Sequence, residues 1–256
     1  MKKKWIFFDV DGTLLNDEKC IPGSAKKAIE ALKAAGHEVA IATGRAPFMI
    51  QHVREALGID TFVSFNGQFV VYKGEVIHKN PYRSADLENL ERFAARFRHP
   101  LVFMGEADMK ANVKDNPLIR ESLATLNYEH PAYQDRYYAE TEIYQALLFC
   151  REEEEKAYAS LQPFRIVRWH PYSADILPKN GSKAQGIKKL LEWAGDQPED
   201  VIAFGDGAND IEMLSFAGIG VAMGNAVDRL KTVADFVTKP VDEDGIAYAV
   251  DQLRLA

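Results

Sequence analysis

Short apolar runs alternate with amphipathic stretches along the first third of the chain. The runs 5–8, 39–42 and 61–65 have the length of strands, and each is followed by polar residues. Between them, apolar residues recur at helical spacing, which predicts helices over 22–36 and 47–57. Continuous apolar strands separated by helices are typical of a parallel sheet covered on both faces.

A similar pattern returns in the last third. An amphipathic helix is predicted after Lys183, followed by a buried strand at 201–204 and two shorter strand candidates at 219–222 and 236–237. The segments 69–72 and 75–78 flank Lys73-Gly74 and are interpreted as a hairpin added to the first group of strands.

The segment from Tyr82 to about Pro178 has a different character, with more aromatic and charged residues and a weaker alternation. We predict helices over 87–97 and 152–161 and a strand over 144–149. The sequence therefore predicts an α/β fold. A Rossmann-like parallel sheet core would be formed by residues 1–81 and 180–256, and an inserted α+β cap domain by 82–179.

Composition excludes several classes of protein. The chain has 256 residues, 47% of them hydrophobic and 27% charged, which suffices for the cores of two domains. A formal net charge of -7 argues against nucleic-acid or anionic-membrane partners. No apolar stretch approaches the ~20 residues of a membrane span. Cys20 and Cys150 lie far apart, as expected for unpaired thiols, so we expect a cytoplasmic protein.

Polar residues that could take part in a chemical reaction lie where the predicted core strands end. Asp9 and Asp11 follow the first strand and project to the same side, because strand side chains alternate between faces. Thr43 follows the second strand, Lys183 precedes or opens a helix, and Asp206, Asn209 and Asp210 follow the strand at 201–204. Carboxylates, a hydroxyl and a lysine are the groups that phosphoryl transfer requires.

Each of these features also has a structural explanation. An Asp-rich turn is often only a polar loop, Thr43 can cap a helix, and Lys183 can be a surface charge. A calcium loop of the EF-hand type is excluded because Gly12 directly follows the second aspartate. Two carboxylates as close as Asp9 and Asp11 repel each other, unless a cation binds them or they take different roles in a reaction.

Four short motifs, spread over nearly the whole chain, resemble those of the haloacid dehalogenase-like hydrolases. They are Asp9-x-Asp11-Gly12-Thr13-Leu14, Thr43-Gly44-Arg45, Lys183, and Gly205-Asp206-x-x-Asn209-Asp210-x-x-Met213-Leu214. The sequence Ser64-Phe65-Asn66-Gly67 and an insertion between the second and third motifs are similar to the Cof-type (subclass IIB) sugar phosphatases. One departure is Ala184, where the family often has glycine after the motif lysine.

The resemblance implies a Mg²⁺-dependent phosphomonoester hydrolase that acts on a small phosphorylated metabolite. Asp9 would be the nucleophile that forms an aspartyl-phosphate, and Asp11 the proton donor and acceptor, with a pKa held near the working pH by its anionic surroundings. The implied Mg²⁺ ligands are Asp9, the backbone carbonyl of Asp11 and Asp206. The residues implied to hold the phosphoryl group are Thr43, Gly44, Lys183 and Asn209, with Asp210 and Arg45 in supporting positions.

The inserted segment has its own candidates, Arg168 and His170, which precede the return to the core. We expect them either to contact the leaving group of the substrate or to be structural. A sugar phosphate is the favoured substrate and a monomer the favoured state. Two other functions remain open: a phosphotransferase or phosphomutase with the same intermediate, and a non-catalytic binding module that is phosphorylated on Asp9.

Overall fold

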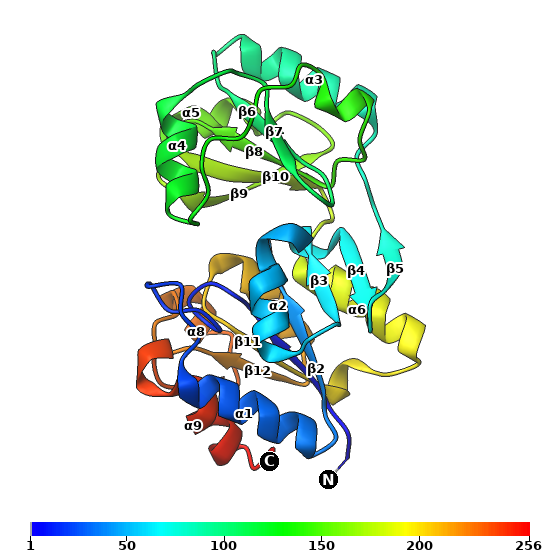
Figure 1. The fold of residues 1–256 in the computed structure, drawn as a ribbon, viewed down its shortest axis with the longest axis vertical. Coiled ribbons are helices and arrows are strands. Elements are labelled where there is room, and N and C mark those ends of the chain that lie inside the picture. Colours follow the sequence, from blue (N-terminus) through cyan, green and yellow to red (C-terminus); the bar gives the residue numbers. More distant parts are fainter. Residues whose placement is uncertain (1) are drawn as a thin grey trace. The chain divides into compact units, whose positions relative to one another are not determined.

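The structure is a computed structural model that describes residues 2–256 (Figure 1). Contacts divide the chain into two compact units. We call them the first unit, which contains the residues up to Arg45, Met49–Lys79 and Ser182–Ala256, and the second unit, which contains Ala46–Phe48 and Asn80–Gly181. No helix among residues 2–256 is long and apolar enough to cross a membrane.

An eight-stranded sheet forms the centre of the first unit. Its strands, in spatial order, are β13 (Phe236–Val237), β12 (Ile219–Ala222), β11 (Val201–Gly205), β1 (Trp5–Phe8), β2 (Glu38–Ala42), β3 (Phe62–Ser64), β4 (Phe69–Tyr72) and β5 (Glu75–Lys79). Pairing is parallel from β13 to β3, whereas β3, β4 and β5 pair antiparallel. The carboxyl ends of the parallel strands therefore meet at one edge, where ligands of open α/β sheets bind.

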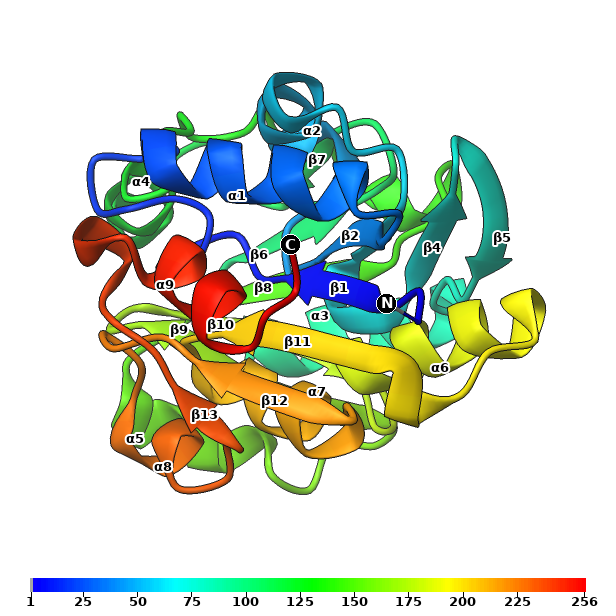
Figure 2. The same cartoon turned by 90° about the horizontal axis from the view of Figure 1, so that it is seen from below.

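Helices cover both faces of this sheet (Figure 2). On one face lie α1 (Gly23–Ala34), α2 (Gln51–Leu57) and α9 (Gly245–Gln252), and on the other α6 (Lys183–Ala194) and α7 (Ile211–Phe216). The remaining elements are short: α8 (Asp228–Lys231) and the 3₁₀ turns η1 (Pro47–Ile50), η2 (Phe65–Gly67), η5 (Pro198–Asp200), η6 (Ala208–Asp210) and η7 (Val241–Glu243).

Strand β1 lies between β11 and β2, and all four of its residues are buried. Trp5 and Phe7 point toward the apolar cluster that includes Ile187 and Leu190 of α6. Since side chains alternate along a strand, Asp9 continues this row on the α6 side. Its backbone N–H donates to the Phe204 carbonyl of β11 at 2.9 Å, so the hydrogen bonding between β1 and β11 also fixes the backbone of Asp9.

The second unit contains a five-stranded antiparallel sheet in the order β7-β6-β8-β10-β9. The strands are β6 (Leu101–Met104), β7 (Met109–Ala111), β8 (Gln145–Phe149), β9 (Phe164–His170) and β10 (Ser173–Pro178). With them come the helices α3 (Ser84–Ala95), α4 (Pro117–Ala124) and α5 (Glu152–Glu155) and the 3₁₀ turns η3 (Tyr137–Ala139) and η4 (Lys156–Tyr158). Its core contains Leu87, Phe103 and Leu148.

The α/β fold class with a central parallel sheet is confirmed. The helix predicted over 152–161 is wrong in extent, because α5 ends at Glu155 and a 3₁₀ turn follows. A run of four glutamates favours the start of a helix but provides no apolar face to extend it. Several elements of the second unit were not predicted, and the boundaries 1–81, 82–179 and 180–256 remain a prediction about domains.

Helix α6 packs unusually close to the sheet at Gly186. A Cβ atom at this position would lie 2.7 Å from the Gly67 Cα and 2.4 Å from a methyl of Val63. The close approach sets the height of α6 over β3 and η2, and thereby the position of Lys183 at the start of the helix.

We expect Gly186→Ala to lower the free energy of unfolding by about 1 to 3 kcal/mol, because overpacking outweighs the higher helix propensity of alanine. The matched control is Gly23→Ala at the start of α1, where a Cβ atom would have no neighbour within 4 Å. That variant should be neutral or more stable by up to about 1 kcal/mol. Urea denaturation measures both, and equal stabilities for the two variants would contradict the close packing of α6.

Candidate active site

Lys183 is the centre of the polar cluster at the carboxyl end of β1. Its side chain is fully buried, and its ammonium group donates to Asp9 Oδ1 at 2.5 Å and to Asp210 Oδ1 at 2.6 Å. Ser182 precedes it as the N-cap of α6, with its hydroxyl accepting from the Gln185 N–H. The cap fixes where α6 begins, and therefore where Lys183 points. The surface role considered for Lys183 is wrong.

Burial and the neighbouring opposite charges shift the pKa values of Asp9 and Lys183 in opposite directions. Burial raises the pKa of Asp9 well above its usual range; Lys183 opposes the shift, while Asp210 and Asp206 add to it. Burial disfavours the charged form of Lys183, but its two carboxylate partners outweigh that effect and raise its pKa. The ammonium group therefore stays charged, and Asp9 lies among more negative charge than Lys183 alone compensates.

Asp206 is the least compensated carboxylate of the cluster. It follows β11, and among the described side chains only the Thr13 hydroxyl donates a hydrogen bond to its carboxylate, at 3.3 Å. Burial, followed by the charge of Asp210, raises its pKa to about 7. Gly12, at a φ of +74°, leaves room for this carboxylate, because a Cβ atom there would lie 2.2 Å from Asp206 Oδ2.

The cluster provides an oxygen donor set for a divalent cation. Asp9, Asp206 and Asp210 each offer a carboxylate oxygen, and these three oxygens lie within 4.8 Å of one another. Hard cations such as Mg²⁺ prefer oxygen ligands of this kind. A cation bound by Asp9 and Asp206 would favour their ionised forms and offset their mutual repulsion. The residues present therefore fit the magnesium ion that the family resemblance implies.

Asp210 is less free to bind a metal than its neighbours. One oxygen contacts Lys183, and the other accepts the backbone N–H groups of Asp206 and Gly207 at 3.0 and 2.9 Å. These bonds close the loop after β11 and fix Asp206. Both oxygens of Asp210 are therefore engaged, and its supporting position in the active site stays a prediction.

Asp11 lies in a different electrostatic environment from Asp9. Arg45 forms a two-pronged ion pair with it, Nε to Oδ2 and Nη2 to Oδ1, both at 2.7 Å, and Lys19 reaches Oδ1 at 2.8 Å. Burial alone would raise the pKa of Asp11, but the hydrogen bonds and charges of Arg45 and Lys19 outweigh it and lower the pKa. The predicted pKa near the working pH is therefore wrong for this arrangement, because the carboxylate has cationic neighbours that the sequence did not reveal.

A chain of backbone and amide contacts links the second and fourth motifs. The Thr43 N–H donates to Val63, and its carbonyl accepts from the Asn66 N–H at 3.0 Å. A Cβ atom on Gly44 would lie 2.9 Å from the Asn66 amide nitrogen, and Asn209 donates to the Asn66 side chain at 3.3 Å. Thr43 accepts the Arg45 N–H on its hydroxyl oxygen, which leaves its hydroxyl hydrogen to donate.

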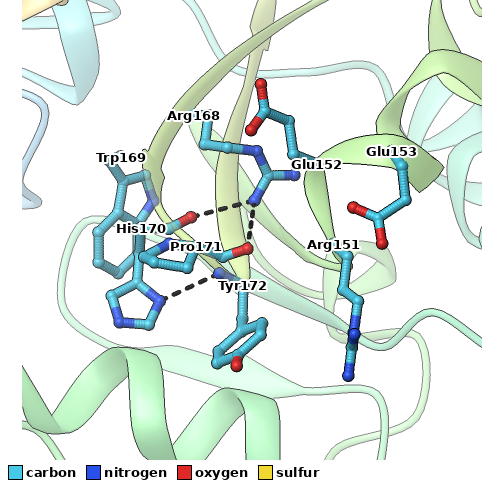
Figure 3. Close-up of a pocket in the computed structure, with 8 residues that line it drawn as sticks. All are labelled: Arg151, Glu152, Glu153, Arg168, Trp169, His170, Pro171 and Tyr172. Atoms are coloured by element: carbon cyan, nitrogen blue, oxygen red, sulfur yellow. Dashed lines mark hydrogen bonds between the residues drawn. The ribbon is translucent and has the colours of Figure 1, made fainter.

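The second unit holds Arg168 and His170, which line an open pocket of about 510 Å³ (Figure 3). Arg168 donates to Glu155 and to the carbonyls of Cys150, His170 and Pro171, so its guanidinium stabilises the β9–β10 turn. His170 Nδ1 accepts the Tyr172 N–H at 3.2 Å, which places the proton of the neutral ring on Nε2. Burial lowers the pKa of His170. Contact of either residue with a substrate stays a prediction.

Three residues near the cluster were not predicted as site residues. Asn66 belongs to a quoted motif, and its position two residues after β3 was the available signal. Thr13, which bonds Asp206, also lies within a quoted motif. Lys19 belongs to no motif, and its pairing with Asp11 depends on a turn that apolar periodicity does not predict.

Comparison with known proteins identifies the class of this chain. The sequence model of the family described as haloacid dehalogenase-like hydrolase matches residues 6–250. The chain belongs to this family.

Individual relatives agree with this assignment. The chain is similar to the putative phosphatase YkrA of Bacillus subtilis (strain 168), at 51% identity over 255 residues that cover 100% of this chain and 99% of the relative. Among solved structures, a hypothetical protein from Geobacillus kaustophilus HTA426 gives a TM-score of 0.93 at 55% identity, covering 99% of this chain and 100% of that one. The subclass IIB sugar phosphatase BT4131 gives 0.89 at 34% identity, with coverages of 99% and 100%. The chain is therefore an enzyme, a phosphatase of the haloacid dehalogenase-like type.

Removing one of the two buried carboxylate partners of Lys183 should destabilise the fold. We expect Asp210→Asn to lower the free energy of unfolding by about 3 kcal/mol, because the ammonium group would keep only one carboxylate in a buried site. The control is Glu192→Gln, which removes the exposed ion pair with Lys189 and should change stability by less than about 0.5 kcal/mol. Urea denaturation measures both, and a small effect for Asp210→Asn would contradict its role in the cluster.

Proposed function

We propose that this enzyme is a Mg²⁺-dependent phosphomonoester phosphatase that works through an aspartyl-phosphate on Asp9. The observation that carries the proposal is the position of Asp9: buried, at the end of a central strand, 2.5 Å from Lys183 and within one oxygen cluster with Asp206. Oxygen nucleophiles of this kind attack phosphorus directly when nearby charges offset their repulsion from the phosphate.

The reaction would proceed in two steps. An Asp9 oxygen forms a bond to phosphorus while the bond to the leaving oxygen breaks. In the enzyme form that reacts, Asp11 carries a proton, which it gives to the departing alkoxide. A water molecule then attacks the phosphoryl group, Asp11 takes the proton of this water, and Asp9 is released together with inorganic phosphate. Lys183, the Thr43 hydroxyl and the N–H of Gly44 would hold the phosphoryl oxygens, with Asn209 beside them.

A magnesium ion would be held by Asp9, the backbone carbonyl of Asp11 and Asp206. When bound, it supplies positive charge that offsets the repulsion between the carboxylates and the phosphate. Asp210 would keep Lys183 and the Asp206 loop in place, and Arg45 would keep Asp11 in place.

A sugar phosphate is the substrate class that we favour. The motif Ser64-Phe65-Asn66-Gly67 supports it, as does the similarity to a protein named as a subclass IIB sugar phosphatase. We propose that residues 82–179 act as a cap that selects the leaving group, with His170 Nε2 as one candidate contact. We also propose that the enzyme is a monomer and acts in the cytoplasm.

Two alternatives would use the same residues. In a phosphotransferase or phosphomutase, a sugar hydroxyl replaces water as the second acceptor, so product analysis with and without an added sugar distinguishes transfer from hydrolysis. A phosphorylated binding module would show no metal-dependent turnover of an aryl phosphate. The separate, cation-paired Asp11 argues for turnover, since a binding module needs no proton carrier beside its phosphorylated aspartate.

Asp9→Asn should abolish catalysis and leave the fold intact. We expect kcat to fall by about 10⁴-fold or more, because the amide cannot attack phosphorus. Mass spectrometry of acid-quenched enzyme should find phosphate on Asp9 in the wild type and none in the variant. Circular dichroism provides the control for folding. Near-normal turnover by a folded Asp9→Asn enzyme would contradict the mechanism.

Magnesium should stabilise the wild type through Asp206. At about 100 times its Kd, Mg²⁺ should add roughly 2.7 kcal/mol of stability, seen as a higher Tm. In Asp206→Asn we expect little response to Mg²⁺, together with a higher Tm without metal, because one of the crowded carboxylates has been neutralised. The matched control, Asp251→Asn on the exposed face of α9, should respond like the wild type. An equal response in Asp206→Asn would remove this residue from the metal site.

A further inference from the structure

Asp11 is bound by cations from two separate parts of the first unit. Arg45 follows β2, belongs to the second motif and contacts both carboxylate oxygens. Lys19 lies in the turn between β1 and α1, belongs to none of the four motifs, and contacts Oδ1 alone at 2.8 Å. The second cation needs an explanation, because Arg45 already pairs with the whole carboxylate.

The turn that carries Lys19 is fixed from several sides. The Lys19 N–H donates to the Asn16 carbonyl at 2.9 Å, and the Asn16 side chain accepts the Cys20 N–H at 3.0 Å. Asn16 also donates to Asp242 of η7 at 2.8 Å. Lys19 itself has a φ of +58°, a conformation that glycine or asparagine adopts more readily than lysine. The side chain is thus held toward Asp11 by a backbone that does not favour a lysine.

Stability does not account for this arrangement. The Lys19 and Asp11 side chains keep 23% and 34% of their exposure, and ion pairs this open to water contribute little to stability. A lysine in a left-handed turn costs at least as much as such an ion pair contributes. Lys19 therefore gives no net gain in folding stability, which leaves the orientation of Asp11 as its effect.

We propose that Lys19 is a positioning residue, which holds the Asp11 carboxylate in the direction needed for proton transfer. The inference rests on the proposed function, in which Asp11 moves the proton. Lys19 and Arg45 Nη2 share Oδ1, whereas Oδ2 accepts only from Arg45 Nε among the described residues. Oδ2 can therefore accept more additional hydrogen bonds than Oδ1, and we assign the proton transfers to Oδ2.

The test compares two substrates that differ in their need for a proton. Phenyl phosphate releases a basic phenolate that must be protonated, whereas p-nitrophenyl phosphate releases a stable anion that leaves unaided. kcat/KM reports the step in which the leaving group departs. Its ratio for the two substrates therefore measures how much protonation of the leaving group contributes to the rate. All assays contain Mg²⁺ and use the whole 256-residue chain.

Lys19→Met should lower kcat/KM for phenyl phosphate by about 10-fold, and for p-nitrophenyl phosphate by less than about 2-fold, because misorientation affects only the protonated departure. Lys19→Gly should give the same pattern, although glycine fits the turn better. Lys19→Arg keeps a cation and should restore most of the ratio. Lys26→Met, at an exposed position on α1, should match the wild type for both substrates.

The outcomes separate this inference from the proposed function. Equal losses on both substrates, or no loss, with an active wild type would overturn the role of Lys19 and leave the phosphatase proposal intact. Full activity of Lys19→Gly beside an unstable and inactive Lys19→Met would also overturn it, because the residue would then serve only the turn. A wild type that hydrolyses neither substrate would overturn the proposed function, and this inference with it.

Discussion

The buried ammonium group of Lys183 is the interaction on which the site depends. It lies between Asp9 and Asp210, at 2.5 and 2.6 Å, and has no exposure to solvent. A lysine is tolerated in such a place only when carboxylates compensate its charge. With Asp206, however, three carboxylates face one ammonium group, which leaves two excess negative charges when all are ionised. A divalent cation would neutralise that excess. Without such a cation, burial and the neighbouring carboxylates raise the pKa values of Asp9 and Asp206.

The fold makes this crowding possible because its rigid parts set the distances. Asp9 and Asp206 follow two adjacent parallel strands, β1 and β11, whose register is fixed by their ladder. Gly12 permits the two loops to approach, and Gly186 lets α6 lie close enough to insert Lys183. Close packing of this kind supplies the energy that holds like charges together, since the charges themselves would separate.

Much of the first unit could be predicted from the sequence, because its strands are short apolar runs with clear ends. The positions of Asp9, Thr43 and Asp206 at strand ends followed from that pattern. The second unit was harder to predict: β9 carries charged and aromatic residues on an edge of its sheet, and β6 and β7 are too short for a periodic signal. The pairing of Lys19 with Asp11 was not predictable either, because Lys19 reaches it through a left-handed turn.

Asp9 and Asp11 are two residues apart, yet the structure separates their surroundings. Asp9 faces Lys183 and two carboxylates, and its pKa is raised, whereas Asp11 faces Arg45 and Lys19, and its pKa is lowered. Neighbouring titratable groups whose pKa values shift in opposite directions are typical of active sites in which one group is the nucleophile and the other transfers a proton. A single cation shared by both carboxylates would not create this difference. Separate cations do, so the pair is better understood as two sites that meet at the end of one strand than as one dyad.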